Sequence, residues 1–498
     1  MSNSGGMFGS RSLWGRAASY VVLLGLATAL TSCNLFSRSG VEDSGSNQYL
    51  PRSKPIDDPY ARIGAKQHPK LVAANGGEYK NQMLESKLAR VVDDLVTHSD
   101  RPARKYQVTI LNTPEINAFA LPGGYLYVTR GLLALANDSS EIAAVLSHEM
   151  AHVTANHGIE RKKRADASVI SARVLTDVVT NPVAGKVAKA DSDQRLAQFS
   201  RNQELQADAL GIKLLGKSGY DAYAAGRFLA GMRRFAEYRN SVSAAEDTQN
   251  FLSTHPSTPK RVELASRHAR FFGPPGTGRR DSEEYLEALD GILYGDTEQE
   301  GFVRGRRFSH KGLGIQFDVP GGFTIDNKAE AVLASGPGET AVRFDAVSRP
   351  PSVSLEDYLQ SGWINGFDPK SLEKGRSAGG LETARGSARA GDWAFDITVI
   401  RVGSQIYRFI VAAPRTTQNL SVTAQQITNS FKLLSRQEVA RLRPLKIKIR
   451  RVRPGDTVGG LARRMRGTPD REKAFRVLNG IVNVADLSGR RFVKLITD

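Results

Sequence analysis

Cysteine is almost absent from this sequence, because Cys33 is the only one among 498 residues. A single cysteine excludes internal disulfide bonds and zinc fingers that are built on cysteine ligands. Aromatic residues are also scarce, at 7% of the chain, and segment 436–498 contains only Phe475 and Phe492. Two rings are too few for a platform on which nucleic-acid bases stack, so we expect no nucleic-acid partner.

Acidic residues are outnumbered by basic ones, which gives the chain a formal net charge of +18. Segment 436–498 holds 17 lysines and arginines against 6 aspartates and glutamates, a net charge of +11. The composition, 40% hydrophobic and 24% charged, is that of a globular protein. The basic character therefore belongs mostly to a C-terminal module.

Long apolar runs are missing, and the uncharged stretch Ala17–Thr31 is 15 residues long. This is short for a helix that spans about 30 Å of hydrocarbon, and it is typical of a signal peptide. The stretch leads into LTSC at 30–33, which resembles a bacterial lipobox. The resemblance implies cleavage before Cys33 and lipidation of that cysteine, and Asn34 favours the periplasmic face of the outer membrane. The alternative is an uncleaved anchor with an incidental cysteine.

The pattern of apolar residues and of chain breaks divides the sequence into six consecutive parts. They are a signal peptide, a flexible tether, a mainly helical domain with a small sheet, a linker, an α+β domain with an antiparallel sheet, and the basic module: 1–32, 33–75, 76–272, 273–300, 301–435 and 436–498. We expect the α+β domain to bind a partner or to act as a spacer.

The stretch SHEMAHVTANHG contains the pattern H-E-x-x-H at His148, Glu149 and His152. Asp138 is a good N-cap for a helix over 139–157, on which the two histidines project from one face and can share a metal ion. Zn²⁺ accepts imidazole nitrogen, and Glu149 is rotated toward a water molecule whose proton it can take. The alternative is a surface helix that happens to carry two histidines.

A third ligand decides between these interpretations. Gly158 stands where a metzincin has its third histidine, and His157 is one residue out of register, so we expect His157 to pack beside the site. Glu204 and Asp208 lie four residues apart on a second helix. Glu204 would complete a His₂Glu set, and Asp208 would accept a hydrogen bond from a ligand imidazole. The alternative for this pair is a solvated acidic helix face.

Three stretches together, HEMAH, SRNQELQAD and NAFALPGGYLYVTRGLL, resemble the M48 family of zinc metallopeptidases over about residues 80–270. The resemblance implies a mainly α-helical gluzincin-type domain with a small sheet, of the periplasmic lipoprotein branch. It also implies one Zn²⁺ per chain, Glu149 as general base and acid, and Asp208 beside the ligands His148, His152 and Glu204.

Two further features fit this family. The stretch from His255 to Arg261 resembles one that follows the zinc-binding glutamate, and it implies that His255 stabilises the oxyanion or takes a fourth metal position. The alternative is a structural histidine near the cleft. The strand Tyr125–Thr129 is expected to be either an edge that pairs with an extended substrate or an ordinary core strand.

The basic tail contains VRPGDTVGGLARRM and later RVLNGI and FVKLI. Over about 450–496 it resembles a LysM-like βααβ module, which implies affinity for peptidoglycan. The alternative is a basic surface that charge alone holds to anionic envelope material.

These observations lead us to expect an exported, lipid-anchored zinc metalloendopeptidase of the bacterial cell envelope. Its substrates would be polypeptides, and a zinc-activated water would cleave them. The family resemblance implies that these polypeptides are misfolded or misassembled envelope proteins. One alternative is an envelope chaperone or assembly scaffold whose metal site is silent or latched. Another is a structural lipoprotein that binds the cell wall.

Overall fold

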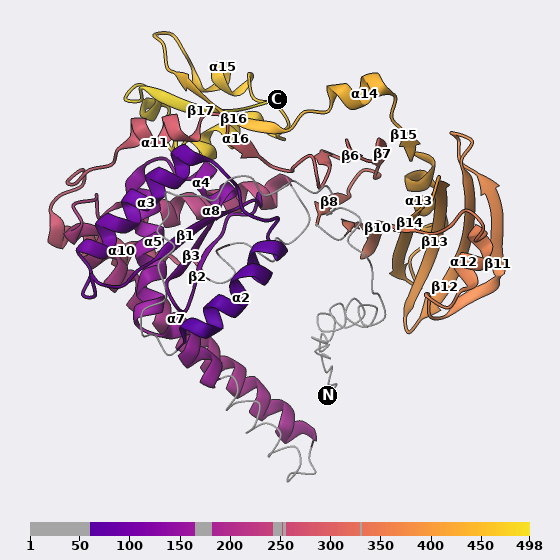
Figure 1. The fold of residues 1–498 in the computed structure, drawn as a ribbon, viewed down its shortest axis with the longest axis horizontal. Helices are drawn as coiled ribbons and strands as arrows, with labels where there is room; N and C mark the ends of the chain where they lie inside the picture. The colour runs from indigo at the N-terminus through magenta and orange to yellow at the C-terminus, as the bar shows by residue number, and fades with distance from the viewer. Residues whose placement is uncertain (1–59, 165–181, 243–250, 252–254, 329–330) are drawn as a thin grey trace, which may run out of the picture. The chain divides into compact units, whose positions relative to one another are not determined.

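The computed structural model describes residues 60–164, 182–242, 251, 255–328 and 331–498 (Figure 1). The predicted signal peptide, Cys33 and most of the predicted tether lie outside these residues. The described chain forms two compact units, of which one comprises Thr340–Asn429. The other comprises the described residues up to Glu339 together with Ser430–Asp498.

A small sheet lies at the centre of the larger unit, next to the predicted metal-binding helix (Figure 1). Its strands are β1 (Gln107–Leu111), β2 (Ala118–Leu121) and β3 (Tyr125–Thr129), in the order β1-β3-β2. β3 pairs in parallel with β1 and antiparallel with β2. The suggestion that Tyr125–Thr129 is an edge strand is therefore wrong, because β3 has a partner on each side, and β1 and β2 form the two edges.

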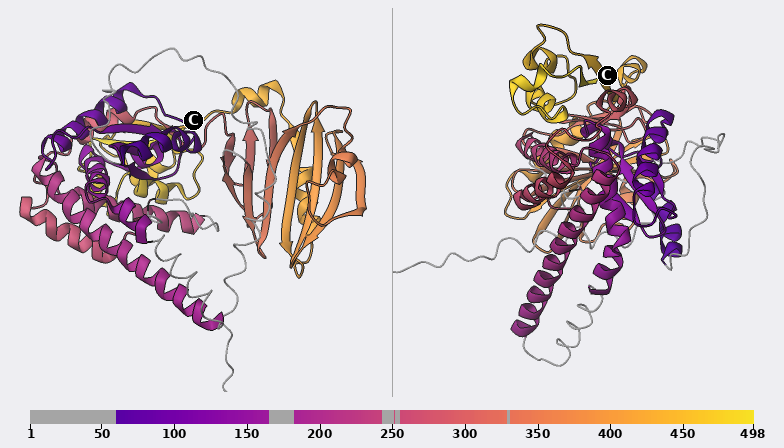
Figure 2. Two further views of the ribbon diagram at one scale, coloured as in Figure 1. Left: turned by 60° about the horizontal axis from the view of Figure 1, so that its bottom comes forward. Right: turned by 90° about the vertical axis from the view of Figure 1, so that its left-hand side faces the viewer.

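Helices surround this sheet, and α5 (Ser139–Thr154) is buried along nearly its whole length. The predicted N-cap is present, since the Asp138 side chain accepts a hydrogen bond of 2.9 Å from the Glu141 amide. The helix ends three residues before the predicted position, because the chain turns at Asn156 with φ of 54°. Figure 2 shows α7 as one long helix that projects from the unit. The helices packed on α5 are α3 (Gln82–Thr97), α7 (Pro182–Lys217) and α8 (Ala224–Val242). The other helices of this region are α4 (Arg130–Leu135), α10 (Pro259–Ala269) and the short η1 (Arg270–Phe272).

The N-terminal tether is shorter than the sequence predicts, because α2 (Ala61–Ala74) is a helix within the range 33–75. Ala61 and Gly64 are buried, and the backbone of Gly64 packs against the carbonyl of Pro122 in the β2–β3 turn. His68 Nδ1 also lies 2.7 Å from the hydroxyl of Tyr127. These contacts explain why a polar stretch with a proline inside it is held as a helix.

The C-terminal module shares one hydrophobic core with the helical domain. Strands β16 (Leu445–Arg451) and β17 (Phe492–Thr497) enclose α15 (Val458–Ala462), α16 (Arg471–Leu478) and η2 (Val484–Leu487). The observed order is one strand, two α-helices, a short 3-10 helix and a second strand. β16 also pairs with β4 (Leu293–Tyr294), and α11 (Ser282–Leu289) packs beside it, so the predicted linker 273–300 is part of this core.

Two fully buried cations join these segments. The ammonium group of Lys494 on β17 donates to the carbonyl oxygens of Ala134, Leu135 and Ala136, at 2.7–3.0 Å, at the C-terminal end of α4. The guanidinium of Arg130 donates to the carbonyls of Leu293 and Gly295 at 3.1 and 2.5 Å. Each cation satisfies carbonyl groups that would otherwise be buried without a donor.

The predicted α+β domain 301–435 is divided between the two units. The smaller unit holds an antiparallel sheet in the order β11-β12-β13-β14-β10 with α12 and α13, whereas the strands before Glu339 belong to the larger unit. The elements of the smaller unit are β10 (Thr340–Ser348), α12 (Leu355–Gln360), β11 (Phe367–Arg376), β12 (Glu382–Ala390), β13 (Trp393–Val402), β14 (Gln405–Pro414) and α13 (Leu420–Asn429). The remaining elements of the larger unit are β5 (Phe302–Arg304), β6 (Arg307–His310), β7 (Ile315–Asp318), β8 (Thr324–Asn327), β9 (Val332–Gly336), β15 (Lys432–Leu433) and α14 (Arg436–Arg441).

Across the described segments, no helix has the length and the apolar character that are needed to cross a membrane.

The buried position of Lys494 leads to a prediction about stability. Lys494→Met removes the donor of three buried carbonyls, and we expect the free energy of opening of the module to fall by about 3 kcal/mol. Hydrogen exchange of the amides in residues 445–497, followed by mass spectrometry, measures this quantity. Lys446→Met, on the exposed side of β16, is the matched control and should change it by less than about 0.5 kcal/mol. Equal effects of the two substitutions would show that the Lys494 contacts contribute nothing specific.

Candidate metal centre

Helix α5 carries the H-E-x-x-H residues into the interior of the larger unit. His148 and Glu149 are buried and His152 is half-buried. Because the histidines are four residues apart, their rings project from one side of the helix, and their Nε2 atoms lie 3.0 Å apart. The arrangement is that of two imidazoles converging on one point in space.

Helix α7 brings the two predicted carboxylates to this point. The oxygens of Glu204 lie 3.4 Å from Nε2 of His148 and 3.4 Å from Nε2 of His152. Asp208 lies one turn further along, and its Oδ1 accepts a hydrogen bond of 3.0 Å from His148 Nδ1. The predicted pairing of the two helices is therefore present, and Asp208 orients the ring of His148 so that Nε2 faces Glu204.

The two helices approach closely because α7 has a glycine at the crossing. A Cβ atom on Gly211 would lie 3.0 Å from the backbone nitrogen of His148 and 3.2 Å from the carbonyl carbon of Ser147. Any side chain at this position would push α7 away from α5 or force the backbone to shift. The sequence pattern alone did not identify Gly211, because a glycine in a helix has many explanations.

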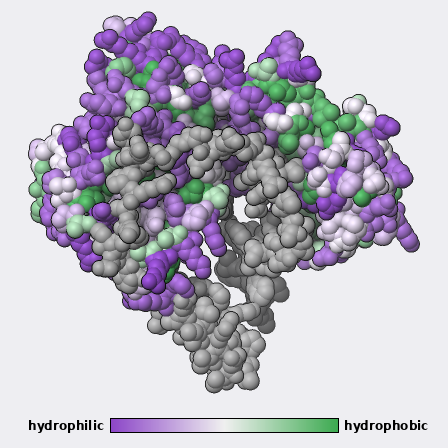
Figure 3. Space-filling model, in the orientation of Figure 1, coloured by the Kyte–Doolittle hydropathy of each residue, from purple (hydrophilic) through white to green (hydrophobic). Residues whose placement is uncertain are grey.

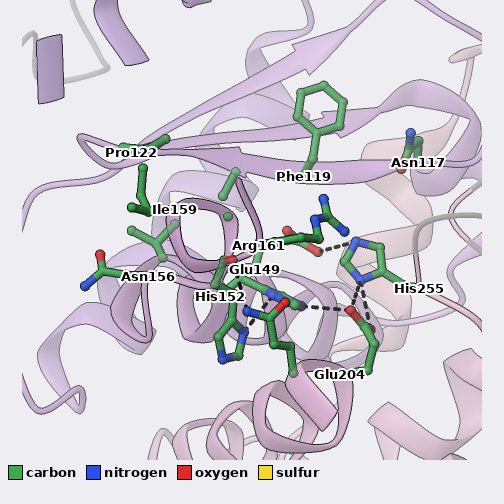
Figure 4. A pocket seen from close by; sticks show the side chains of 15 residues that line it. Asn117, Phe119, Pro122, Glu149, His152, Asn156, Ile159, Arg161, Glu204 and His255 are labelled. Atoms are coloured by element: carbon green, nitrogen blue, oxygen red, sulfur yellow. Dashed lines mark hydrogen bonds and ion pairs between the residues drawn. The ribbon is translucent and has the colours of Figure 1, made fainter. Parts of the chain in front are cut away.

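His255 lies among the donor atoms (Figure 4). Its Nδ1 is 3.0 and 3.1 Å from the two oxygens of Glu204 and 3.3 Å from Nε2 of His148. Its Nε2 lies 3.7 Å from Oε1 of Glu149, and its ring stacks on Phe251 with the centroids 4.4 Å apart. The structure thus places His255 in contact with the predicted ligands His148 and Glu204.

Arg261 on α10 holds both carboxylates of α7. Its guanidinium donates two hydrogen bonds of 2.7 Å to Asp208, and its Nη1 lies 3.0 Å from Oε2 of Glu204. Such a bidentate contact fixes the orientation of a carboxylate as well as its charge. The sequence singled out Arg261 only as the end of a motif, and its role here depends on the contact between α10 and α7.

His157 lies beside the donor atoms and does not join them, as its register predicts. Its Nδ1 is 2.9 Å from Nδ1 of His152, and its Nε2 is 3.1 Å from Oε1 of Gln206. The backbone carbonyl of His157 accepts a hydrogen bond of 3.0 Å from Gln203. These contacts orient the ring of His152 from the side away from Glu204.

Burial and hydrogen bonding together set the protonation states of the site. Burial opposes charge on His148, but hydrogen bonds to the Asp208 and Glu204 carboxylates raise its pKa to about 9. Burial lowers the pKa of His152 to about 4. Burial also disfavours the Glu204 anion, yet hydrogen bonds from three histidines hold the pKa of Glu204 far below its ordinary value. Burial raises the pKa of Glu149.

The donor set fits a metal ion. One atom from each of His148, His152, Glu204 and His255 lies within 4.8 Å of the others. Imidazole nitrogens with a carboxylate oxygen form the donor set that divalent transition metals accept. Among the described residues, nothing donates a hydrogen bond to the buried Oε1 of Glu149. A carboxylate oxygen is thus left free to receive a proton next to the donor group.

A cavity of about 250 Å³ opens over these atoms. Glu149, His152, Glu204 and His255 form its floor, and the edge strand β2 contributes Phe119 and Ala120 to its wall (Figure 4). The remaining wall residues are Asn117, Pro122, Val153, Asn156, His157, Gly158, Ile159, Arg161 and Gln203. The cavity connects the donor group with the unpaired side of β2.

Comparison with known proteins points to one family. Residues 82–269 match the model of Peptidase family M48. The chain is 28% identical over 299 residues to the beta-barrel assembly-enhancing protease of Yersinia pestis, which covers 55% of this chain and 59% of that protein. It is 31% identical over 192 residues to mitochondrial metalloendopeptidase OMA1 of Schizosaccharomyces pombe, covering 37% of this chain and 55% of that protein.

The matches span less than two thirds of the length of these relatives. The matched range 82–269 contains every residue of the donor group, and it ends before the module and the smaller unit. The comparisons therefore support an M48-type metallopeptidase in this part of the chain, as the sequence motifs predict.

The close approach at Gly211 predicts an effect on metal binding. Gly211→Ala places a methyl group against the α5 backbone and moves Glu204 and Asp208 away from the histidines. We expect the dissociation constant for Zn²⁺ to rise by about tenfold, the size of effect seen when supporting contacts of a metal site are lost. Competition with a chromophoric chelator measures it.

Gly231→Ala on α8 is the matched control, since a Cβ atom there would have its nearest neighbour at 3.8 Å. We expect the control to bind Zn²⁺ as the wild type does and to gain up to about 1 kcal/mol of stability from helix propensity. Unchanged affinity in Gly211→Ala would contradict the role of this glycine.

Proposed function

We propose that this chain is a zinc metalloendopeptidase that cleaves polypeptides. The observation that carries the proposal is the convergence of His148 and His152 with Glu204, beside a cavity whose floor contains His152, Glu204 and Glu149. A metal site that served only the fold would have no need for a buried carboxylate without a hydrogen-bond donor beside it.

His148, His152 and Glu204 would hold the zinc ion. When bound, zinc polarises the scissile carbonyl and lowers the pKa of water. Glu149 takes the proton of the attacking water at Oε1 and passes it to the leaving amine, so that one residue acts first as base and then as acid. Asp208 and Arg261 keep the ligands oriented and do not touch the substrate.

The outer edge of β2 would bind the substrate backbone. Among the described residues β2 pairs with no strand on the side away from β3, and an extended peptide can add to such an edge as a further strand. The residues Asn117, Phe119 and Ala120 place this edge along the cavity wall. A peptide bound there would run past Glu149 and present its carbonyl groups to the site.

The position of His255 supports a closed resting state, in which this histidine blocks the site until it moves. Because its Nδ1 lies among the donor atoms, it would serve as a fourth ligand and would have to move when substrate enters. If His255 never leaves this position, no substrate can be cleaved, and the alternative function of an assembly scaffold follows. The two functions differ in whether proteolysis occurs at all.

Further parts of the proposal concern the location of the protein. Lipidation of Cys33 would tether it to the periplasmic face of the outer membrane, and its substrates would be misfolded or misassembled envelope proteins. Relatives that bear the name beta-barrel assembly-enhancing protease support this choice of substrate class. The LysM-like module would add affinity for peptidoglycan.

Replacing the general base tests the proposed reaction. Glu149→Gln keeps the size of the side chain but cannot accept the proton, so we expect casein cleavage to fall by a factor of about 10³. Metal analysis should still find one zinc per chain, because Glu149 is not a ligand. If the wild-type protein loaded with zinc cleaves no faster than Glu149→Gln, the enzyme proposal fails and the scaffold function remains.

Sedimentation with purified peptidoglycan tests the proposed role of the module. Its exposed cations without an ion pair in the described chain are Arg436, Arg441, Arg443, Lys446, Arg451, Arg453, Arg463, Arg464, Arg466 and Arg471. Figure 3 shows that the region of the module facing the viewer, at the upper left, is mostly hydrophilic. Specific recognition predicts that the full chain stays bound at about 0.5 M salt, where simple charge attraction is strongly screened. Release at that salt concentration would favour attraction by charge alone.

A further inference from the structure

Among the described residues that line the cavity, one charged side chain lies outside the metal centre. Glu149, His152, Glu204 and His255 belong to the floor, and His157 is tied to His152. The other wall residues are apolar or carry neutral amides, with the exception of Arg161. A substrate that fills the cavity therefore meets a single fixed charge before it reaches the reacting atoms.

Arg161 follows α5 and extends into the cavity on the side of Glu149 and His255 (Figure 4). It is exposed, whereas Arg261, the arginine beneath the site, is buried and bound to Asp208. Its neighbour Lys163 is paired with Glu160 at 3.0 Å. Within the described part of the chain, no carboxylate lies within ion-pair distance of the Arg161 guanidinium. Its hydrogen-bond donors are thus available to a ligand.

The chemistry of this group selects the ligand. A guanidinium presents a planar fork of N–H donors that matches a carboxylate, and an apolar substrate side chain would leave this fork without a partner. The same cavity is also lined by the apolar residues Phe119, Pro122 and Ile159, which reduce the access of water to a substrate bound in it. An ion pair formed there is therefore less screened than one on an open surface.

We propose that Arg161 is a specificity-determining residue that binds the carboxylate of an aspartate or glutamate side chain close to the scissile bond. The inference rests on the proposed peptidase function and names its substrate class: polypeptide segments with an acidic residue near the cleaved bond. Arg161 acts on substrate choice, so its removal leaves the zinc content and the reaction itself intact.

The experiment starts with unfolded casein, in which mass spectrometry maps the bonds that the zinc-loaded wild type cleaves. One cleaved sequence is then made as acetylated and amidated peptides with Glu, Gln or Lys at each of three positions on either side of the bond. The wild type should prefer Glu over Gln at one position by about two- to fivefold in kcat/KM, the range of a partly exposed ion pair. The preference should shrink at about 0.5 M salt.

Variants assign the preference to Arg161. Arg161→Gln should cleave Glu and Gln peptides equally, and Arg161→Glu should prefer Lys at the same position. Lys163→Gln is the matched control, because it also removes one positive charge and lies only two residues from Arg161. The Lys163 side chain pairs with Glu160. The control should keep the wild-type preference. Because Arg161 is exposed, all variants should show the thermal midpoint of the wild type.

The outcomes separate the two proposals. A preference for Glu that survives in Arg161→Gln, or an absence of preference in an active wild type, overturns the inference and leaves the peptidase function in place. A wild type no more active than Glu149→Gln overturns the peptidase function itself. Peptides with a free C-terminus form a second arm: if they alone respond to Arg161→Gln, the residue binds a terminal carboxylate, which overturns the assignment to a side chain.

Discussion

The carboxylates of α7 face the imidazoles of α5 across a crossing at which Gly211 lets the two backbones approach. The distances from Glu204 to His148 and His152, and from Asp208 to His148, depend on this separation, since the carboxylates reach the histidines from an adjacent helix. A divalent ion tolerates displacements of its ligands of only a few tenths of an ångström. The absence of a side chain at Gly211 thus allows the carboxylates of α7 to reach the histidines of α5.

Buried cations connect separate segments of the larger unit. Arg261 holds the two carboxylates of α7, while Arg130 and Lys494 bind carbonyl groups where the module and the segment around β4 meet the helical domain. Burying a cation costs free energy unless its donors are satisfied, and here each has oxygen partners. The C-terminal module therefore belongs to the same hydrophobic core as α5, the helix that carries the H-E-x-x-H motif.

The local features of the site were predicted well because they depend on spacing along a helix. The N-cap at Asp138, the shared face of His148 and His152, and the separation of Glu204 from Asp208 are properties of a few consecutive residues. The exclusion of His157 from the donors follows from its register in the same way. The role of His255 stayed open, because it lies 51 residues beyond Glu204 and its place depends on how the intervening chain folds back.

By itself the sequence determined the metal motif, the helix that carries it and the family that it resembles, since each is encoded by residue types at short, regular intervals. The tertiary structure decided that β2 and not β3 is an edge strand, that residues 61–74 are a helix, and that the basic module and the predicted linker join the core. It also revealed Gly211 and Arg261 as supports of the site. These facts arise from contacts between segments far apart in the chain, and the energy of such contacts depends on packing that no local pattern records.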